Sequence, residues 1–127
     1  MALAKTARTI VASASNAAGA TARGTIDLEA VYGGMLTLKI TNGGTGPTVQ
    51  CAANVLVAHN ATLPTAASAG ADWKTMYTIG GGTTASAVTE LAIPIEASVM
   101  ALEVEFTGNT SQAVTVESYF SELTTPV

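Results

Sequence analysis

The chain has 127 residues, a length that fits one domain with a hydrophobic core of its own. Only 11% of the residues are charged and the mean hydropathy is +0.39, so the surface is unusually apolar for a chain that works alone. The net charge of −4 and the few, scattered basic residues argue against nucleic acid as a partner, and no apolar run is long enough to span a bilayer.

The first 24 residues differ in pattern from the rest of the chain. "RTIVASA" (8–14) predicts a strand, but Ala12 to Gly24 is small, polar and aperiodic, and no apolar block resembles the core of an export signal. We expect residues 1–24 to form an extended arm that orders against a partner, with residues 25–127 as the folded domain. In this arm the side chains expected to contact the partner are Lys5, Arg8, Ile10, Val11 and Arg23.

Alternation with a period of two dominates the remaining chain and predicts half-buried strands. The segments with this pattern are "GTIDLEAVY" (24–32), "GMLTLKITN" (34–42), "TVQCAANVLVAH" (48–59), "WKTMYTI" (73–79), "AVTELAIPI" (87–95), "SVMALEVEF" (98–106) and "QAVTVESYFSEL" (112–123). The register predicts a core that includes Leu28, Leu36, Leu38, Ile40, Val55, Val57, Leu91, Ile93, Leu102, Val104, Phe106 and Val116.

Turn-forming residues separate these segments. "TNGGTGPT" (41–48), "IGGGTTAS" (79–86) and "TGNTSQ" (107–112) are clusters of Gly and Asn, as hairpin loops with positive φ require. No segment has a helical period. The sequence therefore predicts an all-β chain, a single antiparallel β-sandwich or jelly roll of about eight strands.

The only histidine, His59, and the only cysteine, Cys51, are the first candidates for chemistry. They lie eight positions apart on one predicted strand, or roughly 26 Å along a straight strand, which is too far for a nucleophile and its base. One cysteine, one histidine and unclustered aspartates also leave zinc and calcium without their usual ligands. We expect no catalytic residue, no metal and no cofactor.

Two pairs of carboxylates, Asp27 with Glu29 and Glu103 with Glu105, have the spacing of a glycosidase pair, but the polar face of an amphipathic strand explains them more simply. The loop from Leu63 to Ala71 is small, contains Pro64 and carries no charge, which is typical of a loop that runs over a surface or along a neighbour. Trp73 ends this loop, and we favour a packing plug over a ligand platform for its ring.

The composition resembles that of small virion proteins of tailed bacteriophages. The similarity runs through "KTARTIVASASNAAGATARGTIDL", "GGMLTLKITNGGTGPTVQC", "VLVAHNATLPTAASAGADWKTMYTIGGGTTASAVTE" and "LEVEFTGNTSQAVTVE", which together cover most of the chain. The resemblance implies a virion location and a capsid decoration (cement) protein, which binds the major capsid protein or other virion proteins and reinforces the head lattice. It implies no catalytic residue.

Two functions remain open from the sequence. The first is decoration of the capsid by a homo-oligomer that neither binds nucleic acid nor enters a membrane. Its expected contacts are Leu63, Pro64 and Trp73 in addition to those of the arm. The second is a tail- or fibre-associated sandwich that binds host-surface carbohydrate through Trp73, Tyr77 or Tyr119. An enzyme is the least favoured class.

Overall fold

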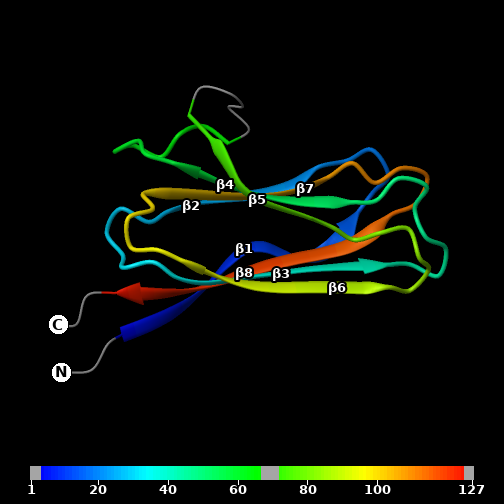
Figure 1. The fold of residues 1–127 in the computed structure, drawn as a ribbon, viewed down its shortest axis with the longest axis horizontal. Helices are drawn as coiled ribbons and strands as arrows, with labels where there is room; N and C mark the ends of the chain where they lie inside the picture. The colour runs from blue at the N-terminus through cyan, green and yellow to red at the C-terminus, as the bar shows by residue number, and fades with distance from the viewer. Residues whose placement is uncertain (1–3, 67–71, 125–127) are drawn as a thin grey trace.

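Eight strands form two four-stranded antiparallel sheets that pack face to face in the computed structural model, which describes residues 4–66 and 72–124 (Figure 1). Sheet A has the strand order β1-β8-β3-β6 and sheet B the order β2-β7-β4-β5. The prediction of an eight-stranded antiparallel sandwich is confirmed. The strands are β1 (Ala4–Asn16), β2 (Ala22–Asp27), β3 (Gly34–Asn42), β4 (Ala52–Ala58), β5 (Lys74–Gly80), β6 (Val88–Ile95), β7 (Ala101–Thr107) and β8 (Val114–Thr124).

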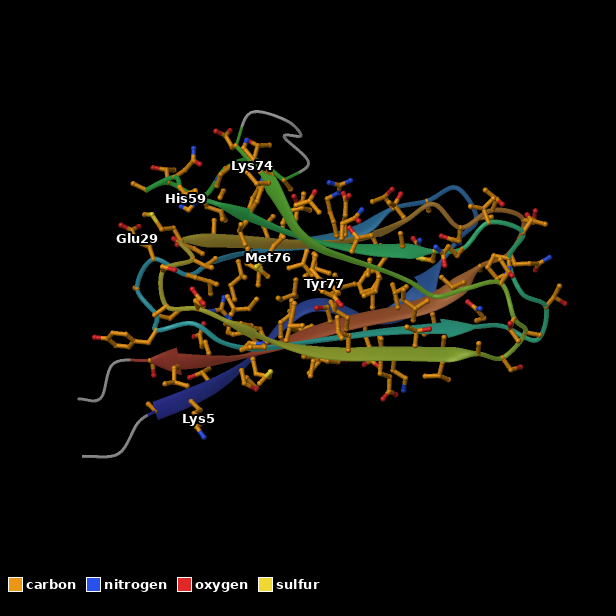
Figure 2. All side chains as sticks on the ribbon, viewed as in Figure 1. Lys5, Glu29, His59, Lys74, Met76 and Tyr77 are labelled. Carbon is orange, nitrogen blue, oxygen red and sulfur yellow. The ribbon has the colours of Figure 1, made fainter. Side chains whose placement is uncertain are left out.

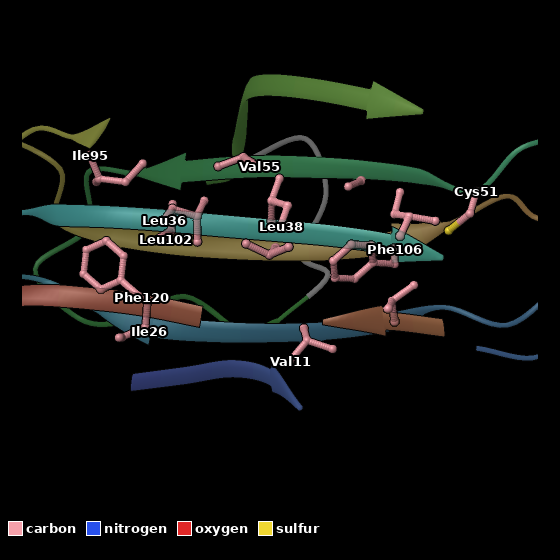
Figure 3. Close-up of a cluster of buried hydrophobic side chains, with 14 of the residues drawn as sticks. Val11, Ile26, Leu36, Leu38, Cys51, Val55, Ile95, Leu102, Phe106 and Phe120 are labelled. Atoms are coloured by element: carbon pink, nitrogen blue, oxygen red, sulfur yellow. The ribbon is translucent and has the colours of Figure 1, made fainter. Parts of the chain in front are cut away.

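The core lies between the two sheets and is built from the inward-facing positions of each strand (Figure 3). Leu36, Leu38 and Ile40 alternate along β3 with exposed or half-buried residues, as a period of two requires. Two aromatic rings, Phe106 of β7 and Phe120 of β8, are the largest fully buried side chains. Burial of this apolar surface is the main favourable term in the folding of the sandwich.

Most of the predicted core residues are fully buried, and three are only half-buried. These three are Val57, Leu91 and Ile93, which pack against the core from its margin. Leu91 and Ile93 lie on β6, the last strand of sheet A, where no further strand covers them. The register predicted from the sequence is therefore right, and the sandwich is open along one side.

The N-terminal segment belongs to the sandwich, which corrects the predicted arm and the domain boundary at residue 24. β1 pairs with β8 from Ala4 opposite Thr124 to Asn16 opposite Val114, and β2 begins at Ala22 and pairs with β7. A Cβ atom on Gly24 would collide with the carbonyl oxygen of Ile10, so the edges formed by β1 and β2 approach each other closely. Contacts within the chain order this segment, because the ladder with β8 satisfies its backbone groups.

Two buried asparagines tie the loops at one end of the sandwich. The Nδ2 of Asn16 donates to the Oδ1 of Asn109 at 3.0 Å, and the Nδ2 of Asn109 donates to the backbone carbonyls of Asn16, Ala17 and Gln112. These bonds join the turn after β1 to the turn before β8, so the ends of the two long strands stay in register. In the described parts of the chain, no helix is long and apolar enough to cross a membrane.

Candidate functional site

The residues predicted to contact a partner do not form one surface. Lys5 and Leu63 are exposed, and Pro64 is half-buried. Val11 lies in the core, Ile10 packs against the core, and Trp73 is buried. The role of these residues in assembly stays a prediction, but most of them already have partners inside the chain.

The two arginines form ion pairs within the chain instead of reaching outward. Arg8 lies 3.1 Å from the nearly buried carboxylate of Glu122, which faces it from β8. Arg23 lies 3.3 Å from carboxylate oxygens of both Glu103 and Glu105 on β7. Of the two carboxylate pairs attributed to an amphipathic strand face, Glu103 and Glu105 are therefore partners of Arg23, and Glu103 is almost completely buried.

A polar row continues from this ion pair across the outer face of sheet B. The Nδ2 of Asn54 donates to Glu105 at 2.9 Å, and the Thr78 hydroxyl donates to the Oδ1 of Asn54 at 2.9 Å. One side chain from each strand thus takes part, in the order Arg23, Glu105, Asn54 and Thr78. The row is satisfied from end to end, so it stabilises the sheet and presents no unpaired group for catalysis.

Cys51 and His59 lie just outside opposite ends of β4, as the spacing predicted, so they cannot act together. Burial raises the pKa of the Cys51 thiol to about 11, although a hydrogen bond from the Thr107 backbone offsets part of this effect. The thiol is therefore protonated at neutral pH and a poor nucleophile. No cluster of three or more potential metal ligands occurs among residues 4–66 and 72–124.

Trp73 plugs the outer face of sheet B. It is 3% exposed and packs with Ala58 and Ala101, which belong to β4 and β7. Its Nε1 donates to the Thr65 carbonyl at 3.0 Å, so the ring also holds the loop that precedes it. Packing alone accounts for this ring, which is not available to stack on a sugar.

The loop between His59 and Trp73 is closed at its base by a second contact. The Nδ2 of Asn60 donates to the Oδ1 of Asp72 at 3.1 Å. The sequence predicted that the Leu63–Ala71 loop runs over a surface or along a neighbour. Leu63 is exposed, and residues 67–71 lie outside the described residues. This latch was not visible in the sequence because its two residues are separated by the loop.

The open edge of β5 is the surface that the sequence analysis missed. Every residue from Lys74 to Thr78 is exposed, and Met76 and Tyr77 are 41% and 43% exposed. The pairing of β4 with β5 slips between Val55 and Leu56, so Met76 is an extra residue in the ladder. Figure 2 shows Tyr77 on the side of the sandwich, between the levels of the two sheets.

The other three edges are better protected against a second chain. β6 contains Pro94 and Glu90, β2 has only 6 residues and carries Arg23, and β1 has two register shifts. β5 has no proline, its only charged residue stands at its first position, and it has one register shift against the two of β1. Among the described strands, β5 therefore has the edge best suited to contact another chain.

Comparisons with known proteins support the fold. No protein-family model matches the chain, and no curated protein sequence matches it. The K3 adhesin domain of Lys-gingipain from Porphyromonas gingivalis matches with a TM-score of 0.51 and 12% identity, over 90% of this chain and 74% of that one. The Yersinia pseudotuberculosis-derived mitogen matches with a TM-score of 0.49 and 10% identity, over 99% and 91% of the two chains.

A phage protein is also among the similar structures. The enzymatically active domain of bacteriophage CBA120 tailspike protein 4 matches with a TM-score of 0.42 and 16% identity, over 96% of this chain and 19% of that one. A family 16 carbohydrate-binding module and infectious bursal disease virus match with TM-scores of 0.46 and 0.44. At these identities the likeness concerns the β-sandwich fold alone.

Proposed function

We propose that this chain is a structural protein of a bacteriophage virion, most simply a decoration protein that binds the capsid lattice. The observation that carries the proposal is the exposed β5 edge, with Met76 and Tyr77 beside an unpaired strand edge. Aromatic residues and methionine are enriched at protein interfaces, and an exposed strand edge can accept a further strand. The resemblance of the sequence to small virion proteins of tailed phages supplies the context.

The way the charges are used supports a structural role. Arg8, Arg23 and Lys39 each lie within 4 Å of carboxylates of the same chain, so their charges are balanced by partners inside the molecule. The cysteine is buried and the histidine stands away from it. What remains for function is shape and exposed apolar surface, which suit binding better than catalysis.

The test is the location and copy number of the chain in purified virions. Quantitative mass spectrometry of separated heads and tails should find it on heads, in a number comparable to that of the major capsid protein. Purified protein should also bind heads that lack it. Tyr77→Lys should weaken that binding at least about tenfold, since it places a charge at the centre of the apolar edge.

Val88→Lys is the matched control, because Val88 is an exposed apolar residue on the edge strand of the other sheet. It should bind heads as the parent does. Absence of the chain from heads would contradict the decoration role. If Tyr77→Lys binds heads as tightly as the parent does, β5 does not take part in the contact with the lattice.

A second candidate, a carbohydrate-binding sandwich on the tail, is favoured by one observation. Tyr119 is 39% exposed beside a depression of about 390 Å³ that is also lined by Lys39, Glu90 and Glu117. An aromatic ring beside hydrogen-bonding groups is a suitable sugar platform. Purified host-surface polysaccharide titrated into labelled protein would shift the Tyr119 ring resonances if this function holds. A few copies per virion, all on tails, would support it.

A further inference from the structure

The outer face of sheet A is a second exposed surface, distinct from the β5 edge. Its register places side chains in rows across β6, β3 and β8: Pro94, Met35 and Ser121 in one row, and Ala92, Thr37 and Tyr119 in the next. In Figure 1 no other described element lies beneath this sheet. Met35 and Tyr119, in adjacent rows of this face, are 44% and 39% exposed.

Along β8 the two ends of this face carry opposite charge, while Glu96, which follows β6, lies at the same end as Lys5 but at the opposite edge of the sheet. At one end the ammonium of Lys39 lies 3.7 Å from Glu90 and 3.8 Å from Glu117, so two carboxylates surround one cation and leave a net negative charge. At the other end Lys5 of β1 stands opposite Leu123, and among the described residues no carboxylate lies within salt-bridge distance of it. Figure 2 shows Lys5 pointing away from the sandwich on this side.

Shallow depressions flank the apolar middle. The one at the acidic end is lined by Tyr119 and its charged neighbours. The one at the basic end measures about 500 Å³ and is lined by Lys5, Gly34, Met35, Ser121 and Leu123. A face with projecting rings and chains between two hollows can interdigitate with another face of the same shape.

We propose that this face binds the same face of a second copy of the chain in a two-fold symmetric dimer. The row of Glu117 and the row of Leu123 and Lys5 are separated by roughly 20 Å along the strands. The midpoint between them falls between the rows of Tyr119 and Ser121. A two-fold axis that lies in the interface at this midpoint, perpendicular to the strands, brings Lys5 of each copy over the acidic end of the other.

The same axis brings the apolar groups together. It places Tyr119 of one copy over the row that holds Ser121 and Met35 in the other copy. A methionine sulfur against an aromatic ring is a favourable contact. The symmetry repeats each contact, as an isologous interface requires.

The size of the face is sufficient for a specific dimer. Four strands about 4.8 Å apart and about eight residues long cover roughly 500 Å² on each copy, or roughly 1,000 Å² in total. That area stands at the lower limit for a biological interface, so we expect a reversible dimer. The proposal goes beyond lattice binding and does not depend on it.

Sedimentation equilibrium of the purified chain over a wide concentration range tests the proposal. The parent should be dimeric at micromolar concentrations. Tyr119→Asp and Met35→Asp should each be monomeric there with unchanged circular dichroism, because both positions are exposed and the sheet does not need them to fold. Val49→Asp is the control, since Val49 is more exposed than either but lies in the loop between β3 and β4, where it pairs with Thr110.

A charge reversal provides the sharper test. Lys5→Glu should weaken dimerisation about tenfold, because each dimer contains two such pairs and both become repulsive. Adding Glu117→Lys in the same chain should restore most of the affinity. A parent that is monomeric throughout overturns the proposal, and so does a dimer that Tyr119→Asp and Met35→Asp both leave intact.

Two further outcomes separate the dimer from sugar binding and from the decoration role. If the parent stays monomeric and host-surface polysaccharide perturbs Tyr119, the face binds sugar and the dimer is excluded. If the parent dimerises but the chain is absent from heads, the dimer stands and the decoration role fails.

Discussion

Trp73 offers the clearest test of how the outer face of sheet B is held. A buried tryptophan removes about 200 Å² or more of apolar surface from water, worth roughly 5 kcal/mol at 25 cal/mol per Å². Because Ala58 and Ala101 are small and cannot move into the vacated space, Trp73→Ala should lower the free energy of unfolding by about 3–5 kcal/mol.

Replacement by phenylalanine separates packing from hydrogen bonding. Trp73→Phe keeps most of the apolar volume but removes the Nε1 donor to Thr65. Thr65 is exposed, so its carbonyl can bond to water, and the cost should be only about 1 kcal/mol for the lost bond in addition to the smaller ring.

Urea unfolding followed by circular dichroism measures all three proteins. In the parent the fluorescence of Trp73, the only tryptophan, reports on the plug separately from the sheets. The reasoning would be refuted if Trp73→Ala unfolded at the urea concentration of the parent, or if Trp73→Phe were as unstable as Trp73→Ala.

Three further predictions follow from the fold. Deleting residues 1–16 should unfold the chain, because it removes β1 and leaves β8 as an uncovered edge. If circular dichroism shows that the deletion variant is folded, the segment is an arm that the sandwich does not need. Leu38→Ala should lower the free energy of unfolding, measured in urea, by about 2–5 kcal/mol, whereas replacing its exposed neighbour in Thr37→Ala should change it by no more than about 0.5 kcal/mol. Equal losses in the two variants would mean that the register is wrong. Burial raises the pKa of the Cys51 thiol to about 11, so as the pH rises through 9 the unfolded chain loses its thiol proton before the folded chain does. Between pH 8 and pH 10 the free energy of unfolding of the parent should therefore fall by about 1.4 kcal/mol more than that of Cys51→Ala. Parallel pH profiles of the two proteins would show that the thiol is not buried.

The strands of this chain could be predicted because most of them are half-buried. From Leu36 to Thr41 on β3 and from Val114 to Glu117 on β8, apolar and polar residues alternate, so the face of each residue follows from its position. The core residues at Leu36, Leu38 and Val104 were predicted for this reason.

The N-terminal segment was mispredicted because alternation fails there for a physical reason. β1 is an edge strand with two register shifts, and nearly all its side chains are exposed. Its place in the sheet depends on backbone hydrogen bonds to β8, which any residue except proline can donate. Small residues such as Ala12 and Ser13 therefore look like a flexible arm in the sequence.

The two candidate surfaces could not be predicted from the sequence either. An alternating pattern shows that Tyr119 and Met35 lie on polar faces, but only the strand order β1-β8-β3-β6 places them beside each other and sets Lys5 beyond them. The exposed edge of β5 likewise depends on which strand ends sheet B. The order of strands in a sheet depends on how the connections cross between the sheets, and the alternating pattern within a single strand carries no information about it.

The two proposed surfaces are compatible within one assembly. β5 and β6 lie on the same side of the sandwich, opposite the side where β1 approaches β2 (Figure 1). A two-fold axis that crosses the strands of sheet A keeps this side on one surface of the dimer, so both β5 edges point the same way. With sheets about 10 Å apart, the two edges are separated by roughly 30 Å.

If both proposals hold, such a dimer would bind the lattice at two points, and the second contact would form at a high effective concentration. Tyr119→Asp should therefore weaken retention on heads by about 100-fold or more although β5 is unchanged, because a monomer keeps only one contact. Retention measured by dilution of decorated heads tests this, with Val49→Asp as control. Retention of the monomeric variant equal to that of the parent would mean that the dimer does not bridge the lattice and that one β5 edge alone is sufficient.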